Sequence, residues 1–542
     1  MDKVYFGGLD LLKPNVIEPT KMPRTAVIPV VKDKKTGYLN AAPYSGGVTN
    51  TNPLQILFGP KSSHAIEAFK QADEFCVAIP KRDQIDNMWV MALEVPHGID
   101  EIEVAGWHTL ESQKIKTPGI MDCPLNLECK KIYFGQLPPP WRAIVISEVI
   151  GVSIDSDLLE KSRSEVVKLY PMHEAGSHPE TGLYGPSVLS GELIPFPEPA
   201  PKGKRVYKEE GGEKRKSFVN APDLYKPEND GVLMNAIWPR PSYILMTTDT
   251  NGKTKGLPLS GGSLQSTEPA VQIPVPKDTD CYKNIKRTKE FVVSIPDRRL
   301  IKNFELFEKA ATDSFEAAGF TLLRPNMLKI SGIAECPVTM DCKAVMFEDV
   351  PGTDYAILVG RRVGVVLDKE INTRLDPALH PLRERLTYMN KVYASFIYAV
   401  MDRGMVKKWG FHDENDISVR PLPSWGNRYT GGWWGPGSAL NYWLIECCDE
   451  GLITKREYYK IRHAVRLWGD GAGIPHLTEY YDDKMKKELR KRLTKLFSMM
   501  AWAHRDYNKW DEVHEYLGIF PEETRDHHSG PVYHEKWYNQ VV

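Results

Sequence analysis

Asn40-Ala41-Ala42-Pro43 brings together residue types that leave the backbone open to a flat ligand. Small side chains and a proline that lacks an N–H suit an edge strand, or a place where the backbone closely approaches a ligand. A polar turn ending in Gly37 precedes the stretch and Ser45-Gly46-Gly47 follows it, a pattern that predicts a hairpin. Two interpretations are open: a strand whose backbone accepts a flat cofactor, and an ordinary edge strand that enters a glycine turn.

Lys61, Ser62 and Ser63 have the chemistry of an anion site. They stand at the start of the stretch 63–70, which is predicted to be helical. A cation, two hydroxyls and the free N–H groups of a helix N-terminus can together hold a phosphate. Ordinary capping of the helix is the alternative, because serine is also a common N-cap residue.

Much of this pattern occurs twice along the chain. Three blocks recur in the same order at nearly constant offset: 23–47 with 239–262, 74–80 with 290–296, and 122–130 with 335–343. Such a repeat indicates a tandem duplication of one domain. In the second copy, Lys277-Asp278-Thr279 stands at the place of Lys61-Ser62-Ser63, whereas Lys255-Gly256-Leu257-Pro258 replaces the first stretch and loses its asparagine.

With these blocks in view, the sequence resembles the flavin reductase-like, flavoredoxin-type family of FMN-binding split barrels. The resemblance rests on Asn40-Ala41-Ala42-Pro43-Tyr44-Ser45, on Lys277-Asp278-Thr279 with the strand 290–293, on the Cys-Pro-x5-Lys strands, and on the late strands 143–149 and 356–360. It covers residues 20–160 and 235–370, half of the chain.

The resemblance implies FMN as the cofactor, with the flavin ring against Asn40, Ala41, Ala42, Pro43 and Ser45. It implies phosphate contacts from Lys61, Ser62 and Ser63 in repeat one and from Lys277 and Thr279 in repeat two. Because members of the family dimerise with the flavin near the interface, two fused copies are expected to form a covalent pseudo-dimer. We expect one FMN, held mainly by repeat one. Whether repeat two binds a second FMN is left open.

Family members often carry a histidine near the start of the late strand, close to the flavin. Arg142 in repeat one and Tyr355 in repeat two stand at that position, so the histidine is absent from both copies. This departure puts nicotinamide-linked flavin reduction in question. Arg142 is a candidate contact for an anionic substrate, and a solvated surface arginine is the alternative.

These observations predict a β-rich α+β chain, with two tandem FMN-binding split β-barrels that form a pseudo-dimer and a C-terminal α-helical domain. We place repeat one at 1–160, a Pro- and charge-rich connection at 161–235, repeat two at 236–372 and an aromatic-rich helical domain at 373–542. Apolar residues at three- and four-residue spacing predict helices over 382–400, 454–468 and 483–506.

Trp433 and Trp434 lie in a glycine-rich aromatic loop between the first two of these predicted helices. Such a loop can close over a flavin or stack on an aromatic substrate. It can equally clamp the helical domain onto the barrels, so both interpretations stay open.

The formal net charge of −1 and the lack of a long apolar stretch give no reason to expect nucleic acid or a membrane as partner. The N-terminus lacks the pattern of a signal peptide, which favours a cytoplasmic protein. The repeated Cys-x5-Cys pairs are interpreted as buried thiols, with a redox pair or half a metal site as alternatives. His173 and His178 flank a predicted loop without the spacing of a helical metal pair, and we expect no metal.

Three functions are considered. The first is an FMN-dependent oxidoreductase that acts on a dedicated small organic substrate, an aromatic one included, in a pocket covered by the C-terminal domain. The second is an NAD(P)H:flavin reductase or a flavoredoxin-like electron carrier, with NAD(P)H as donor and a redox protein as partner. The third is a non-catalytic scaffold that has lost the cofactor. No catalytic acid or base can be assigned from the sequence, and a homo-oligomer is compatible with all three.

Overall fold

The computed structural model describes both repeats with gaps, together with strands from the regions that flank them. The described residues are 2–12, 16, 20, 24–34, 37–51, 53–60, 63–80, 84, 87, 91, 100–137, 143–159, 172–176, 183–186, 189–195, 208–210, 216–220, 240–264, 271–310, 314–369, 388–393, 397–401, 491, 494, 495, 498 and 499.

Repeat one folds into a β-barrel whose strands pair in a closed ring. The order is β2 (Arg24–Lys32), β4 (Tyr44–Thr51), β5 (Leu54–Phe58), β10 (Ala143–Asp155), β9 (Leu125–Gln136) and β6 (Glu74–Ile79), with β6 paired back onto β2. The helix α2 (Ser63–Gln71) adds Phe69 to the barrel interior. There Phe58, Phe69 and Phe75 meet edge to face, with ring centroids 5.1–5.5 Å apart. Each large apolar side chain buried in this way contributes about 1.5–3 kcal/mol, so the interior is a main source of stability.

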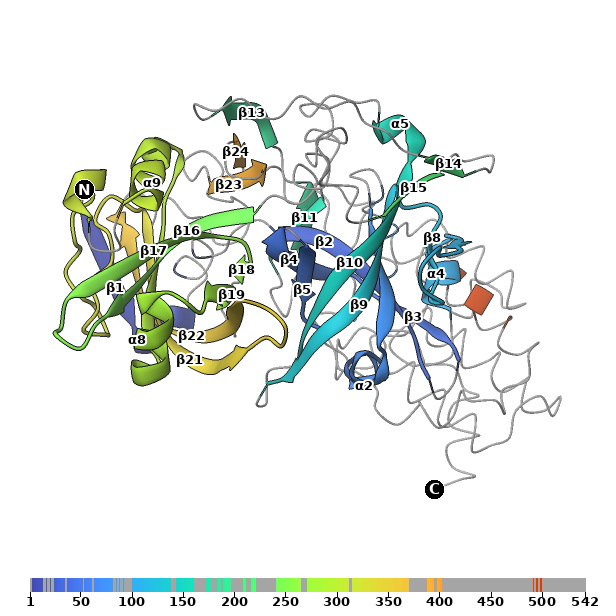
Figure 1. Ribbon diagram of the computed structural model, residues 1–542, viewed down its shortest axis with the longest axis horizontal. Coiled ribbons are helices and arrows are strands. Elements are labelled where there is room, and N and C mark those ends of the chain that lie inside the picture. The colour runs from blue at the N-terminus through green and yellow to red at the C-terminus, as the bar shows by residue number, and fades with distance from the viewer. Residues whose placement is uncertain are drawn as a thin grey trace, which may run out of the picture.

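Repeat two forms the same ring from equivalent strands. They are β16 (Arg240–Thr248), β20 (Glu290–Ile295), β21 (Val338–Asp349), β22 (Tyr355–Asp368), β19 (Val271–Pro276) and β18 (Ser263–Leu264). β17 (Thr254–Ser260) pairs with β16 and continues into β18 through Gly261 and Gly262. The helix α8 (Asp280–Thr288) takes the place of α2. The predicted tandem split barrels are confirmed (Figure 1).

The acidic residue that the repeat places before its second cysteine has the same task in both barrels. Glu128 accepts hydrogen bonds from the backbone N–H groups of residues 113 and 114, at 2.7 and 2.5 Å. Asp341 accepts them from residues 327 and 328, at 2.6 and 3.2 Å. Burial raises the pKa of both carboxyls above the ordinary value. Each carboxylate thus ties a loop to the barrel, which explains why the duplication keeps an acid there.

The two barrels contact each other through equivalent residues. Gly262 donates its N–H to the carbonyl of Val48 at 2.7 Å, and a Cβ on Gly47 would collide with the Gly262 carbonyl. Gly47 and Gly262 end the same block of the repeat, so the contact has the self-matching character of a two-fold interface. A shared apolar cluster consists of Leu57, Leu137, Ile144, Ile146, Met346, Val350, Tyr355, Ile357 and Val359. The predicted pseudo-dimer is confirmed.

Strands outside the two rings extend both sheets. β1 (Lys3–Gly7) pairs with β22 of repeat two, although the predicted boundary groups these residues with repeat one. β15 (Lys216–Asn220) pairs with β10 of repeat one, and β14 (Lys208–Glu210) pairs with β15. β11 (Met172–Gly176) pairs with β2 and with β12 (Leu183–Pro186), while β13 (Leu189–Pro195) joins the sheet of repeat two. The connection therefore supplies strands to both sheets, and His173 lies in a strand instead of the predicted loop.

The helix predicted over 382–400 is wrong where the structure describes it. β23 (Tyr388–Tyr393) and β24 (Ile397–Met401) form an antiparallel hairpin, and β23 pairs with β16. The apolar residues fit a helical period, but the stretch is rich in aromatic and β-branched residues, which favour strands when a sheet edge is available. The helix predicted over 454–468 lies outside the described residues, and the described positions between 491 and 499 are helical.

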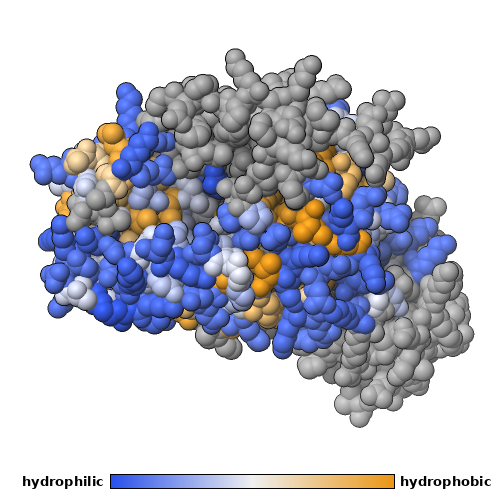
Figure 2. Space-filling view, in the orientation of Figure 1, coloured by the Kyte–Doolittle hydropathy of each residue, from blue (hydrophilic) through white to orange (hydrophobic). Residues whose placement is uncertain are grey.

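Short elements complete the described part. They are η1 (Gly8–Leu12), β3 (Leu39–Ala41), α4 (Glu101–Val104), β7 (Thr109–Leu110), β8 (Gly119–Ile120), α5 (Ser156–Leu159), η6 (Arg298–Leu300), α9 (Ile301–Glu308) and η7 (Glu316–Ala318). Hydrophilic side chains cover most of the described surface on the face shown in Figure 2. Within the described residues, no helix combines the length and the apolar character needed to cross a membrane.

Candidate flavin site

The first candidate residues lie on β3, which pairs with β2 at the rim of the barrel of repeat one. Val31 is opposite Asn40 and Val30 is opposite Ala41 in this pairing. Both Asn40 and Ala41 are buried, and Ala42 packs against the barrel interior. The short strand agrees with the edge strand that the small residues and Pro43 predict.

Glu101 contacts this strand from α4. Its Oε2 atom accepts a hydrogen bond from the Ala41 N–H at 2.5 Å and one from the Asn40 side-chain amide at 3.2 Å. Only 6% of Glu101 is exposed. Asp100 is the N-cap of α4 and accepts hydrogen bonds from the N–H groups of Ile102 and of residue 103. This cap fixes the start of the helix and so the backbone position of Glu101, its first residue. Two donors thus converge on one acceptor.

Sequence reasoning missed Glu101. The nearest signal is Asp100 followed by Glu101 and Glu103, which indicates the start of a helix but not what the helix contacts. Glu101 is far from Asn40 in the sequence, and only the tertiary fold joins them.

The C-terminal part of the chain reaches the same helix. Ser498 donates its hydroxyl to the Val104 carbonyl at 2.8 Å, and Thr494 is buried. α4 therefore contacts β3 on one side, through Glu101, and the segment around 494–498 through Val104.

The equivalent face of repeat two is closed by aromatic side chains. Gly256 stands at the place of Ala41, and a Cβ there would lie 2.8 Å from Phe315 and 2.9 Å from Phe307. The rings of Phe307 and Phe315 stack with centroids 5.0 Å apart and belong to a second apolar layer of this repeat. Repeat two thus packs phenylalanines against the strand position that corresponds to Ala41.

The predicted phosphate residues of repeat two are engaged within the protein. Thr279 is the N-cap of α8: its hydroxyl accepts from the Tyr282 N–H at 3.2 Å and donates to the Pro276 carbonyl at 2.7 Å. Lys277 donates its Nζ to the Thr353 carbonyl at 2.6 Å. The capping interpretation accounts for this geometry, and phosphate binding by Lys277 and Thr279 stays a prediction.

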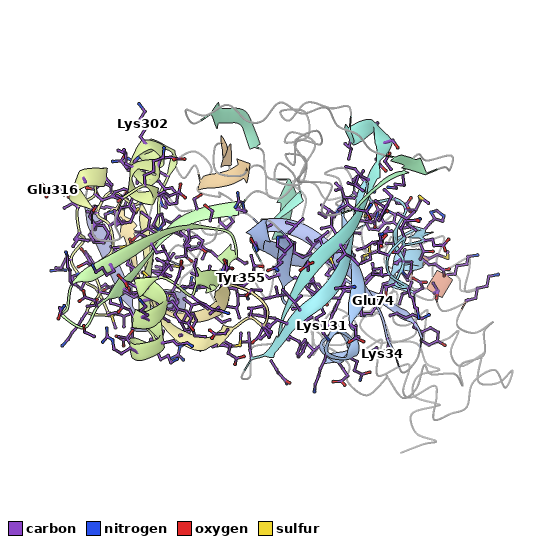
Figure 3. The ribbon with its side chains drawn as sticks, viewed as in Figure 1. Lys34, Glu74, Lys131, Lys302, Glu316 and Tyr355 are labelled. Atoms are coloured by element: carbon purple, nitrogen blue, oxygen red, sulfur yellow. The ribbon has the colours of Figure 1, made fainter. Side chains whose placement is uncertain are left out.

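Tyr355, the first residue of β22, holds the two repeats together. Its hydroxyl lies 2.8 Å from Gln55 Oε1 and 3.0 Å from Thr49 Oγ1, both in repeat one. Figure 3 shows Tyr355 between the two barrels. Burial raises the pKa of its phenol to about 12. The neutral phenol therefore forms hydrogen bonds across the interface between the two repeats.

The structure brings together only part of the predicted set. Asn40, Ala41, Ala42 and Pro43 are consecutive at β3, and Ser45 is in β4, where it pairs with Ala26 of β2. Ser63 begins α2. The other predicted residues, Lys61, Ser62, Arg142, Trp433 and Trp434, lie outside the described part.

The six described cysteines are buried in the barrels. Burial raises the pKa of Cys129 and of Cys281 to about 12, so both remain protonated at neutral pH. Reactive cysteines need a lowered pKa and access to solvent, whereas these behave as small apolar side chains. In the described residues, no group of histidine, cysteine and carboxylate side chains has the arrangement of a metal site.

Comparison with known proteins agrees with this fold. Residues 22–172 and 234–396 each match the model of the flavin reductase like domain, and the chain belongs to that family. It is 27% identical over 128 residues to an uncharacterized protein of Methanothermobacter thermautotrophicus, and the match spans 23% of this chain and 60% of that protein.

Two solved structures are among those similar to the chain. Nitrilotriacetate monooxygenase component B from Bacillus cereus is 25% identical, with 28% of this chain and 80% of that chain covered and a TM-score of 0.27. Flavoredoxin of Desulfovibrio vulgaris is 17% identical, with 33% and 92% covered and a TM-score of 0.27.

Proposed function

We propose that this chain is an FMN-dependent oxidoreductase whose flavin is held by repeat one. The observation that supports this most is the convergence of the Asn40 amide and the Ala41 N–H on one acceptor, Glu101. The edge of a flavin ring carries carbonyl and ring-nitrogen acceptors, and in the proposed complex such an acceptor takes the place of Glu101 Oε2 on these donors. The aromatic layer over Gly256 argues against an equivalent site in repeat two.

In this proposal each residue has one task. The ring contacts are Asn40, Ala41, Ala42, Pro43 and Ser45, and the phosphate contacts are Lys61, Ser62 and Ser63. Lys277 and Thr279 are a weaker second phosphate position. When bound, FMN supplies the electron-transfer chemistry, and the protein supplies binding, orientation and electrostatics. Glu101 is a positioning residue, because it holds the two donors of β3 in place until the flavin takes its position on them.

The substrate side of the proposal concerns the C-terminal region. The Ser498–Val104 contact supports a covered site, because it brings that region onto the helix that carries Glu101. We propose a small organic substrate, with Arg142, Trp433 and Trp434 as its contacts.

The test is the flavin absorbance that purified protein retains after FMN is added and the excess is removed. We expect one equivalent per chain, and weaker retention in Asn40→Ala. Lys255→Ala, at the equivalent position of repeat two, is the matched control and should leave retention unchanged. A colourless protein refutes the proposal and favours the scaffold, two equivalents refute the single site, and equal retention of FAD refutes the preference for FMN.

The family assignment also supports a second candidate, an NAD(P)H:flavin reductase or flavoredoxin-like electron carrier. Anaerobic mixing with NAD(P)H separates the two. Bleaching of the bound flavin would favour the reductase or carrier, and an unchanged spectrum would favour the oxidoreductase with a dedicated substrate.

A further inference from the structure

β1 and β15 occupy the same position on the two barrels. β1 runs antiparallel along β22, with Lys3 opposite Asp368. β15 runs antiparallel along β10, with Lys216 opposite Asp155, and both pairings continue in register over five residues. Figure 1 shows β1 in blue among the green and yellow strands of repeat two, whereas β15 lies beside β10 in repeat one.

A buried lysine anchors each of these strands by the same two hydrogen bonds. Lys3 donates its Nζ to the Cys336 carbonyl at 2.7 Å and to Asp368 Oδ1 at 2.5 Å. Lys216 makes the equivalent bonds, to the matching cysteine carbonyl at 2.7 Å and to Asp155 Oδ1 at 2.5 Å. The two lysine side chains are 7% and 9% exposed. The side chain of Asp368 is 8% exposed and that of Asp155 is 22% exposed. Lysine side chains are seldom buried this far unless they are paired.

The sequence shows to which copy each strand belongs. Lys3 is followed by Asp10-Leu11-x-Lys13-Pro14, and Lys216 is followed at the same spacing by Asp223-Leu224-x-Lys226-Pro227. The offset between the two segments is the one that relates Cys123 to Cys336. β1 therefore opens the first copy and β15 opens the second, and we call them the head strands.

Each head strand pairs with the barrel of the other copy. β1 precedes repeat one and adds to repeat two, and β15 precedes repeat two and adds to repeat one. If β15 were simply the strand that follows repeat one, the strand that follows repeat two would take the same place on β22, but β1 takes it. This is the exchange of a domain-swapped dimer, with both protomers in one chain.

Apolar side chains of the head strands also enter the other barrel. Phe6 packs against the core of repeat two, and Val219, at the equivalent position, is buried in the core of repeat one. The edges of β22 and β10 are covered in this way, which protects them from pairing with another chain.

We propose that each barrel has a strand-binding site on this edge, and that its ligand is the head strand of the other copy. The site takes an extended segment that begins with lysine. Main-chain hydrogen bonds supply affinity, while the carboxylate, the cysteine carbonyl and the apolar position supply specificity. The exchange locks the two barrels together, and neither copy is complete without the other.

Disulfide trapping in the full-length chain tests the exchange. Tyr5 is opposite Val366, and the position equivalent to Val366 in repeat one is Ser153. We expect Tyr5→Cys/Val366→Cys to form a bond within the chain, as shown by thiol counting and peptide mapping. The matched control Tyr5→Cys/Ser153→Cys, which fits a strand returned to its own barrel, should form none. A bond in the control, a bond between chains, or no bond in either variant overturns the proposal.

A peptide experiment tests the specificity of the site. In full-length Lys3→Glu, the glutamate places a negative charge beside Asp368, which weakens the binding of the chain's own head strand to β22. A labelled peptide of residues 2–12 should then bind at one per chain, and the same peptide with methionine for lysine should bind about tenfold more weakly, because a hydrogen-bonded charge pair is lost. Equal binding of the two peptides, or no binding of either, contradicts the assigned specificity.

Discussion

The hydrogen bonds of Tyr355 allow a direct test of how strongly the two repeats hold each other. Tyr355→Phe keeps the ring in the shared apolar cluster and removes only the hydroxyl. Gln55 then loses a partner at 2.8 Å and Thr49 one at 3.0 Å. Tyr355 is 3% exposed and Gln55 is 4% exposed, so water cannot readily replace the hydroxyl.

The size of the effect follows from these contacts. A hydrogen bond inside a protein contributes about 0.5–1.5 kcal/mol, and a buried acceptor left without a partner costs about 1–3 kcal/mol. We therefore expect Tyr355→Phe to lower the free energy of unfolding by about 2 kcal/mol at neutral pH.

The same variant has a pH signature. Burial raises the pKa of Tyr355 from 10.0 to about 12. Since the phenol ionises first in the unfolded chain, its contribution is complete below pH 10 and is lost as the pH rises toward 12. Phenylalanine has no such dependence, so the difference between the two proteins should narrow above pH 10.

Urea unfolding followed by tryptophan fluorescence measures this difference. Tyr133→Phe is the matched control, because that phenol also crosses the interface but bonds to Glu348 at an exposed site, at 2.7 Å. The control should lose less, about 0.5–1.5 kcal/mol, because water can replace the phenol at the exposed Glu348. Equal unfolding midpoints for Tyr355→Phe and the wild type would refute the assigned role of Tyr355.

Three further predictions follow from buried groups. Lys3→Met should lower the free energy of unfolding by up to about 3–5 kcal/mol, because it removes the nearer cation of the buried Asp368 and leaves Arg299 at 4.0 Å, and adding Asp368→Asn should recover part of the loss in urea unfolding. Burial raises the pKa of Asp341 above its ordinary value of 3.8. The stabilisation from this carboxyl is therefore complete below pH 3.8 and is lost as the pH rises through the raised pKa. Asp341→Asn should remove this fall in the free energy of unfolding when unfolding is measured across the pH range. Gly47→Ala should destabilise the interface, because its Cβ would meet a carbonyl of the other repeat, and an unchanged melting temperature would contradict the contact.

Much of the fold could be predicted because its signals are local or repeated. Alternating apolar residues mark the strands, and the blocks shared by the two copies give the tandem arrangement without any tertiary information. The small residues and Pro43 also predicted an edge strand, as observed at β3. Such features depend on neighbours in the sequence.

The rest depends on contacts between distant segments. Glu101 joins Asn40 only when the barrel is folded, and no local pattern specifies that contact. The hairpin of β23 and β24 forms because β16 offers a pairing edge, although its apolar spacing also fits a helix. The exchange of head strands was equally hidden, because the repeated Lys3 and Lys216 segments show equivalence but not which barrel each strand joins.

The two copies agree where they hold the chain together and differ where a ligand is proposed. The head strands share one register and one lysine anchor, so both barrels need each other for the same reason. On the face where the flavin is proposed to bind, however, repeat one has Glu101 with the donors of Asn40 and Ala41, and the corresponding strand of repeat two has Phe315 against Gly256. In a homodimer every substitution changes both faces at once, whereas a fused pair can close one face and keep the other. The exchange of head strands makes each repeat depend on the other. Repeat two is therefore preserved even without a flavin site, because repeat one still requires its barrel and its head strand.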